Sequence, residues 1–231
     1  MKFNPPLLSA TLLRRYKRFL SDITINSEEF IAHVPNTGAM TSCWEENWGC
    51  AVSKSDNPKR KLPYTLELTH NGETWIGVNT ANANKLMSEW LSARSLLPFE
   101  PYETIKPEKK IGDSRIDFYL ESPHLPPCYI EVKSVTLKKE GIAQFPDAVS
   151  VRGQKHLQEL MRLKDSGARA CLVFVVQRED VEMVAPARDI DPKYADLLVE
   201  AFDKGVEIFA YQCKMSLEEI KLGKALPIRL D

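Results

Sequence analysis

Three polar side chains stand among apolar neighbours in two short segments of the chain. Asp117 belongs to residues 114–120 (SRIDFYL), and Glu131 and Lys133 belong to residues 128–133 (CYIEVK). β-Branched and aromatic residues dominate both segments, and the proline-rich stretch between them predicts a turn, so the two are expected to form a β-hairpin. Residues two apart on a strand share a face. Glu131 and Lys133 would therefore lie side by side, with Asp117 across from Glu131.

Two carboxylates in this arrangement repel each other, and burying them without a cation is costly. A hard divalent cation bound by oxygen ligands would relieve the repulsion. A lysine beside it could orient a water molecule or stabilise charge that develops on a phosphoryl group. Glu-x-Lys is also common on exposed strands, where the side chains form only a solvated ion pair. The spacing of the three residues leaves both interpretations open.

The same spacing resembles the PD-(D/E)xK active site of the restriction-endonuclease-like superfamily, with Ile116 where the proline of PD would stand. A wider resemblance runs nearly from end to end of the chain. Six motifs occur in the order found in the bacterial sugar fermentation stimulation protein A family: YKRFL (16–20), PNTGAM (35–40), SRIDF (114–118), CYIEVKSVTL (128–137), FPDA (145–148) and RGQKHL (152–157). Their conjunction is far more specific than any one of them.

This resemblance implies an α+β fold of two domains. Residues 1–80 would form an OB-type β-barrel, and residues 81–231 an α/β restriction-endonuclease-like domain with a mixed sheet flanked by helices. The residues agree, because Asn71-Gly72 lies between two strand-like segments of the first region and predicts a β-hairpin. Beyond residue 80 the patterns predict helices, the first one capped by Asn79-Thr80 and ending near Ser95. The others are expected over 151–165 and 193–203, and the apolar run 170–176 predicts a strand buried on both faces.

The resemblance also implies a function. It points to a protein that binds single- or double-stranded DNA without sequence preference and is linked to regulation of maltose metabolism. The alternative is an active nuclease that uses Mg²⁺ or Mn²⁺ to hydrolyse phosphodiester bonds. Asp117, Glu131 and the Val132 carbonyl would then hold the metal ion, and Lys133 would position the attacking water. Glu89, on the helix after residue 80, would complete the site, although a surface glutamate remains the simpler interpretation.

Two basic segments are expected to contact DNA. The first, residues 14–18, combines arginine and lysine side chains with the ring of Tyr16. The second, residues 152–156, lies at the start of a predicted helix, whose free backbone N–H groups can bind phosphate. A solvated barrel face balanced by Asp22, Glu28 and Glu29 is the alternative for the first segment, and a hydrogen-bonded structural role is the alternative for His156. The expected DNA contacts are Arg14, Arg15, Tyr16, Lys17, Arg18, Arg152, Gln154, Lys155 and His156.

Composition limits the remaining choices. The chain has 231 residues, a formal net charge of -1 and five cysteines without a CxxC pair, so any DNA binding must come from local patches and the thiols suit a reducing compartment. No signal-peptide pattern or membrane-length apolar run occurs, and we expect a cytoplasmic protein with no membrane partner. A homodimer is left open. A sugar or nucleotide enzyme has no Gly-rich phosphate loop or nucleophile motif in its support.

Overall fold

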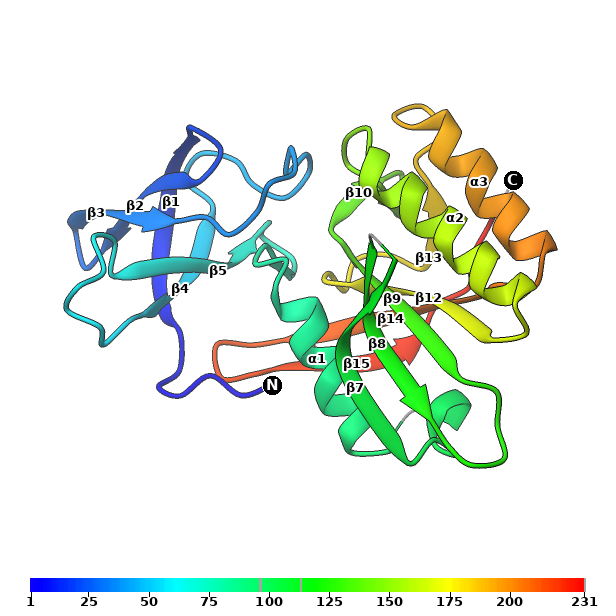
Figure 1. Cartoon of the computed structure of the whole chain (residues 1–231). Helices are drawn as coiled ribbons and strands as arrows, with labels where there is room; N and C mark the ends of the chain where they lie inside the picture. The colour runs from blue at the N-terminus through cyan, green and yellow to red at the C-terminus, as the bar shows by residue number, and fades with distance from the viewer. Residues whose placement is uncertain (96, 113, 231) are drawn as a thin grey trace.

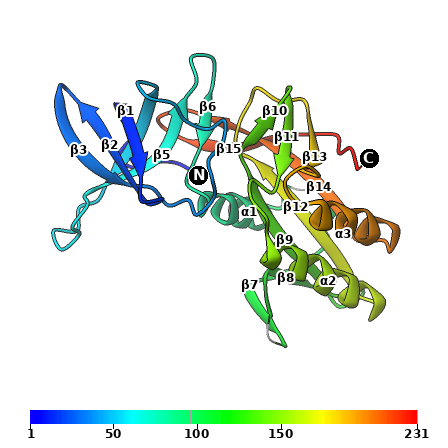
Figure 2. The same cartoon turned by 90° about the horizontal axis from the view of Figure 1, so that it is seen from above.

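The computed structural model describes residues 1–95, 97–112 and 114–230, and the chain forms a barrel followed by a mixed sheet with helices (Figure 1). Viewed from above, the barrel lies to one side, and α2 and α3 lie next to each other at the far side of the sheet (Figure 2). The predicted α+β architecture is confirmed.

The first region is a closed five-stranded barrel with one short additional strand. Its sheet has the order β3-β2-β1-β4-β5-β6, and a parallel pairing between β3 and β5 closes it. The strands are β1 (Leu8–Tyr16), β2 (Leu20–Ile25), β3 (Glu28–His33), β4 (Gly49–Lys54), β5 (Tyr64–His70) and β6 (Trp75–Gly77). Alternate side chains such as Leu12, Ile23 and Leu66 point inward and are fully buried. Gly72, at φ +93°, makes the turn of the predicted hairpin between β5 and β6.

The second region is built on a six-stranded mixed sheet of order β15-β14-β12-β9-β8-β7. Its central strands β9, β12 and β14 are parallel, and the outer pairings are antiparallel. The strands are β7 (Thr104–Ile111), β8 (Ser114–Glu121), β9 (Cys128–Val135), β12 (Arg169–Val176), β14 (Glu207–Met215) and β15 (Ile220–Ala225). A small sheet beside it joins β10 (Leu137–Lys139), β11 (Ile142–Phe145) and β13 (Met183–Pro186).

Helices cover both faces of the large sheet. α1 (Asn82–Ser92) packs on one face, and α2 (Val151–Asp165) and α3 (Pro192–Asp203) pack on the other; a 3₁₀ turn spans Leu97–Phe99. β12 lies between these layers. Its Val173 joins the core on the α1 side, and its Leu172 joins the core on the α2 and α3 side. The prediction that 170–176 is buried on both faces is therefore confirmed, as is the helix over 151–165.

Two local expectations differ from the structure. α1 begins at Asn82, after the predicted cap at Asn79-Thr80, and ends at Ser92, before the predicted end near Ser95. No side chain caps its start. The amides of Asn79 and Asn82 instead donate to the buried carboxylate of Glu67 in the barrel, at 2.8 and 3.0 Å. The chain's first residues also differ, because the backbone N–H of Phe3 bonds to the carbonyl of Glu218 in the second region.

A buried arginine after β12 connects the two regions. Arg178 is 2% exposed and donates to both carboxylate oxygens of Asp180, at 2.7 and 2.9 Å. Its Nη1 also donates to the carbonyl of Thr136 in the second region and to that of Ser42 in the barrel. A planar guanidinium suits such a junction because its donors are fixed in direction.

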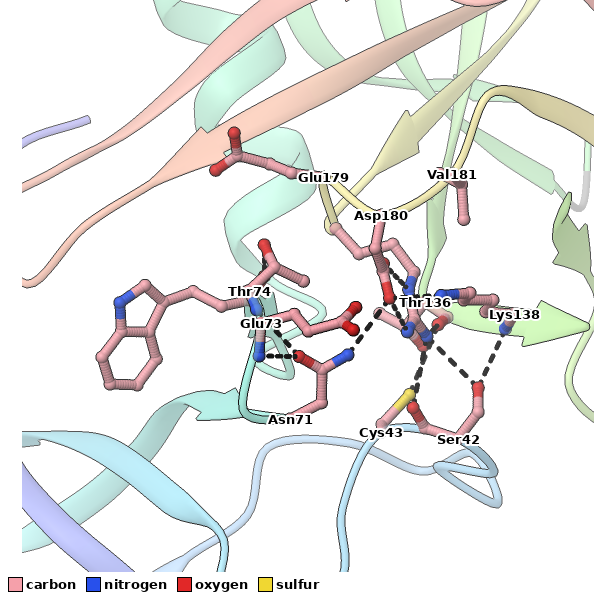
Figure 3. Close-up of polar contacts among 12 residues, drawn as sticks. Ser42, Cys43, Asn71, Glu73, Thr74, Thr136, Lys138, Glu179, Asp180 and Val181 are labelled. Carbon is pink, nitrogen blue, oxygen red and sulfur yellow. Dashed lines mark hydrogen bonds and ion pairs between the residues drawn. The ribbon is translucent and has the colours of Figure 1, made fainter. Parts of the chain in front are cut away.

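Asp180 supplies the carboxylate of this junction. It accepts hydrogen bonds from Lys138 at 2.7 Å and from Asn71 of the β5–β6 turn at 3.1 Å (Figure 3). Burial alone would raise the pKa of Asp180, but the hydrogen bonds from Arg178 and Lys138 outweigh it and hold the pKa well below its usual range. The carboxylate stays ionised, and the orientation of the barrel is fixed by charged hydrogen bonds.

Replacing Asp180 by Asn is expected to destabilise the protein by about 3 kcal/mol or more, because Arg178 would keep a buried charge without its counter-ion. Urea unfolding at pH 7 measures this. The unfolded-state pKa of an aspartate is about 3.9. A carboxylate whose pKa is lower in the folded state stabilises the protein above that pH, and the stabilisation is lost as the pH falls from there through the folded-state pKa. The difference between the variant and the parent should therefore shrink as the pH falls below about 4.

The matched control is Asp196→Asn, which breaks an exposed ion pair with Arg188. Exposed pairs contribute little, so this variant should change stability by less than about 1 kcal/mol. Equal stability of the two variants would contradict the role given to Asp180.

Candidate active site

The β8–β9 hairpin brings the predicted carboxylates together. Phe118 pairs with Ile130 and Leu120 with Cys128, a register that continues toward Asp117 and Glu131. The ladder ends before that pair, and Asp117 instead accepts a hydrogen bond from the backbone N–H of Val132 through Oδ2, at 2.8 Å. The predicted hairpin is confirmed by this pairing, and its register places the two carboxylates next to each other.

Glu131 and Lys133 share one face of β9 and meet a histidine from α2. Lys133 Nζ lies 2.5 Å from Glu131 Oε1 and 3.0 Å from His156 Nδ1, and the same histidine nitrogen contacts Glu131 Oε1. All three side chains are buried or nearly so, with relative exposures of 2%, 9% and 5% for Glu131, Lys133 and His156. Val132, between them, faces the opposite core, as strand alternation requires.

The two carboxylates have opposite pKa shifts. Burial and the charge of Glu131 raise the pKa of Asp117, although hydrogen bonds from Val132 N–H and the Asn84 amide partly offset this. Burial would also raise the pKa of Glu131, but contacts with His156 and Lys133 outweigh it, and the pKa is lowered. The contacts of Glu131 thus favour its ionised form, whereas burial and the neighbouring charge oppose ionisation of Asp117.

One oxygen of this cluster has no partner. Oε2 of Glu131 is buried and makes no hydrogen bond with any described residue. An ionised oxygen in that state is costly, and a cation beside it would remove the cost. Within the described residues no group of three or more His, Cys, Asp and Glu side chains is arranged to hold a metal ion. The two carboxylates nevertheless fit a hard cation, which completes its ligand set with carbonyls and water.

The cluster lies at the wall of a cleft of about 1060 Å³ between the barrel and the second region. Residues 36–39 of the barrel, the start of α1, the β8–β9 hairpin and the start of α2 line it. Arg15 and Arg18 line it from the barrel, and Arg152 lines it from α2. The cleft therefore combines an acidic wall with cations from both regions.

Family models match both parts of the chain. The model described as "SfsA N-terminal OB domain" matches residues 13–78, and the one described as "Sugar fermentation stimulation protein RE domain" matches residues 81–219. The second match alone covers more than half of the chain. The chain belongs to the SfsA family.

Related SfsA proteins match over their whole length. Sugar fermentation stimulation protein homologs are 49% identical in Pseudoalteromonas atlantica, covering 99% of both chains, and 48% identical in Shewanella sp. strain ANA-3, covering 100% of both. A solved structure of Pyrococcus furiosus SfsA in complex with Ca²⁺ superposes with a TM-score of 0.89 at 29% identity, covering 99% of this chain and 98% of that one. In the part of the SfsA chain that the structure describes, no helix is long and apolar enough to cross a membrane.

Of the first basic segment, only Arg15 and Arg18 line the cleft. Arg14 and Tyr16 lie on the other side of β1, where both bond to Asp22, at 2.6 and 2.9 Å. Because alternate side chains of a strand point to opposite faces, neighbouring cations cannot serve one groove. The DNA contacts predicted for Arg14, Tyr16 and Lys17 stay predictions, since none of these three side chains lines the cleft.

Of the second basic segment, only Arg152 and His156 line the cleft, one helical turn apart. Gln154 is buried and bonds to Asp191, the N-cap residue of α3, at 2.9 Å, so its predicted contact with DNA is wrong. His156 is a buried, hydrogen-bonded histidine at the carboxylates and not an exposed contact. Lys155 is exposed but does not line the cleft.

Glu89 is not part of the site. Its carboxylate is 55% exposed and pairs with the amino group of Met1 at 2.6 Å, beside a separate pocket that also includes Trp90 and Lys221. The helix residue that reaches the carboxylates is Asn84, whose amide donates to Asp117 Oδ1 at 2.8 Å. The two positions are five residues apart and project in different directions from α1. Asn84 was not predicted from the sequence, because the resemblance points to an acidic residue on this helix and not to an amide.

Replacing Asn84 by Ala should raise the pKa of Asp117 further, because the ionised carboxylate loses one of its two hydrogen bonds. The pKa is measured by following the Asp117 carboxyl carbon in an NMR titration. Asn57→Ala, an exposed asparagine on a barrel loop, is the control and should leave the titration unchanged. An unaltered Asp117 titration in Asn84→Ala would show that this hydrogen bond does not stabilise the ionised form.

Proposed function

We propose that this SfsA protein binds DNA without sequence preference and holds a divalent cation at Asp117 and Glu131. The observation that carries the proposal is the unpartnered, buried Glu131 Oε2 in a cleft whose walls also supply Arg18 and Arg152. Phosphate oxygens complement both features, since they bind cations and accept hydrogen bonds from guanidinium groups. An effect on sugar metabolism, including that of maltose, would follow from DNA binding.

Asp117 and Glu131 would hold the cation with the carbonyl of Val132, a residue that lines the same cleft. Pyrococcus furiosus SfsA was solved in complex with Ca²⁺, which supports a divalent ion, and we propose Mg²⁺ or Mn²⁺ as the working ion. Such an ion, when bound, would neutralise charge on a phosphoryl group and lower the pKa of a bound water. The hydrogen bonds from Asn84 and Val132 N–H fix the direction of the Asp117 carboxylate beforehand.

The cations of the cleft would contact the DNA backbone. Arg18 follows β1 on the barrel and is exposed, and Arg152 is exposed in the first turn of α2. Contacts to phosphates fix the position of a protein on DNA but carry no sequence information. With a net charge of -1 for the whole chain, binding would depend on this local pair and on Arg15.

A second candidate function is hydrolysis of phosphodiester bonds, favoured by the position of Lys133. Its ammonium group is held by Glu131 and His156 and still lines the cleft. An ammonium group has three donors. One can therefore remain for a water molecule or a phosphoryl oxygen in the cleft, where it would orient the nucleophile or stabilise developing charge.

One assay separates the two candidates. End-labelled single-stranded, duplex and branched DNA would be incubated with the protein, with and without Mg²⁺ or Mn²⁺, beside Asp117→Ala and Lys133→Ala. Cation-dependent cleavage that both substitutions reduce by about a hundredfold or more would support the nuclease. Retention of DNA by all three proteins without cleavage would support a binding protein and contradict the catalytic role of Lys133.

DNA affinity should fall steeply with salt, because phosphate contacts release counterions. Arg18→Gln and Arg152→Gln should each weaken binding and reduce the slope of log affinity against log salt by about one. Fluorescence anisotropy at several salt concentrations measures the slope. Arg14→Gln is the matched control because Arg14 belongs to the same basic segment but bonds to Asp22 outside the cleft. A salt-independent affinity, or equal effects of all three substitutions, would contradict this assignment.

A further inference from the structure

One wall of the cleft is lined by residues 36–39 of a barrel segment, residues 35–43, that is fixed along its length. At its start the carbonyl of Pro35 accepts hydrogen bonds from the backbone N–H and the hydroxyl of Thr80, at 3.3 and 3.2 Å. The buried amide of Asn36 donates to the carbonyl of Val78 at 3.1 Å. These contacts attach the segment to the residues that lead into α1.

Arg15 holds the middle of the segment from the barrel side. Its guanidinium group donates to the carbonyls of Asn36, Gly38 and Ala39, at distances of 3.2, 3.0 and 3.1 Å. Three carbonyls of one short segment are thus drawn onto one rigid cation. Arg15 therefore fixes the shape of the wall and also gives it a positive charge.

The far end of the segment contacts the second region through Met40, Ser42 and Cys43. Asp147 accepts a hydrogen bond from the backbone N–H of Met40 at 3.3 Å, and it packs so closely on Gly38 that a Cβ there would lie 2.1 Å from its carboxylate oxygen. Ser42 then bonds to Arg178 in the buried junction described above. Because both ends and the middle are held, the wall cannot swing away from the carboxylates without breaking several hydrogen bonds.

The fixed wall limits what can enter. The cleft has a volume of about 1060 Å³, comparable with that of sites for small ligands, roughly 300–1,000 Å³, which is room for a few nucleotides. The lining is also chemically mixed. Beside the arginines and carboxylates it includes the apolar side chains Ala39, Ala83, Leu137, Phe145 and Val149.

Apolar and aromatic lining complements the faces of unpaired bases. In a duplex these faces are stacked on one another, and the outside presents phosphates, sugars and base edges. Proteins that bind single strands combine a positive groove for the backbone with aromatic and apolar surfaces for the bases. Arg18 and Arg152 supply cations for the backbone, and Val149, which is 66% exposed, supplies an apolar surface for the bases.

We propose that the cleft takes single-stranded DNA and that the wall formed by residues 36–40 keeps an intact duplex away from Asp117 and Glu131. This inference rests on the proposed function, because it names the form of DNA that would reach the same site. Duplex DNA reaches the carboxylates only where its strands have separated, at an end, a gap or a branch.

The test compares two labelled oligonucleotides with the full-length protein. One is a single strand of about 16 nucleotides, within the length that one OB-type barrel covers. The other is that strand paired with its complement, with the same label and with both ends closed by non-nucleotide linkers, so that it has no unpaired base and no open end. Fluorescence anisotropy is measured without divalent cations so that no strand is cut. The single strand should bind at least about tenfold more tightly, since each base that stacks on the protein adds to its affinity.

A pair of matched variants tests where the strand lies. Val149→Ala removes an apolar side chain that lines the cleft, and Val151→Ala removes an equally small and exposed one that does not. Val149→Ala should weaken single-strand binding several-fold, and Val151→Ala should not. If the duplex binds as tightly as the single strand, or if the two variants behave alike, this inference fails while DNA binding stands. If neither oligonucleotide binds, both proposals fail.

Discussion

The repulsion between Asp117 and Glu131 is the constraint on which the rest of the site depends. Two adjacent strands place both carboxylates at one wall of a cleft, and burial makes their charges more costly. The surrounding polar groups offset part of this cost. Lys133 and His156 hold Glu131 ionised, and Asn84 with the Val132 N–H stabilises Asp117. The remaining unpartnered oxygen of Glu131 is where a cation would complete the balance of charge.

The second constraint is the fixed relation between the barrel and the mixed sheet. Buried charged hydrogen bonds around Arg178 join the regions on one side of the cleft, and Asp147 with the segment 36–40 joins them on another. A site at a junction of this kind is formed before any ligand arrives. Its shape can therefore select among ligands without a closing motion, although it accepts only those that fit the existing space.

Much of the fold could be predicted from the sequence because its signals are local. The apolar run 170–176, the Asn71-Gly72 turn and the helix over 151–165 each depend on neighbouring residues, and all are confirmed. Asp117, Glu131 and Lys133 could also be placed together, since the hairpin that joins them is local and strand alternation fixes their faces.

The remaining site residues depend on contacts between distant segments, which spacing does not specify. Glu89 was predicted from its charge, but the direction of α1 brings Asn84 to the carboxylates instead. Gln154 was predicted from its place in a basic segment, but the packing of α2 on α3 directs it to Asp191. The wall formed by residues 36–40 could not be predicted, because the groups that anchor it belong to segments far away in the chain.

The central claim is that Asp117 and Glu131 form a cation site, and diffraction from crystals soaked in Mn²⁺ tests it most directly. The anomalous difference map should show a peak between the two carboxylates, within about 2.5 Å of an oxygen of each. The peak should disappear in crystals of Glu131→Gln soaked in the same way. An absent peak in the parent protein, or a Mn²⁺ ion bound only elsewhere on the molecule, would contradict the account.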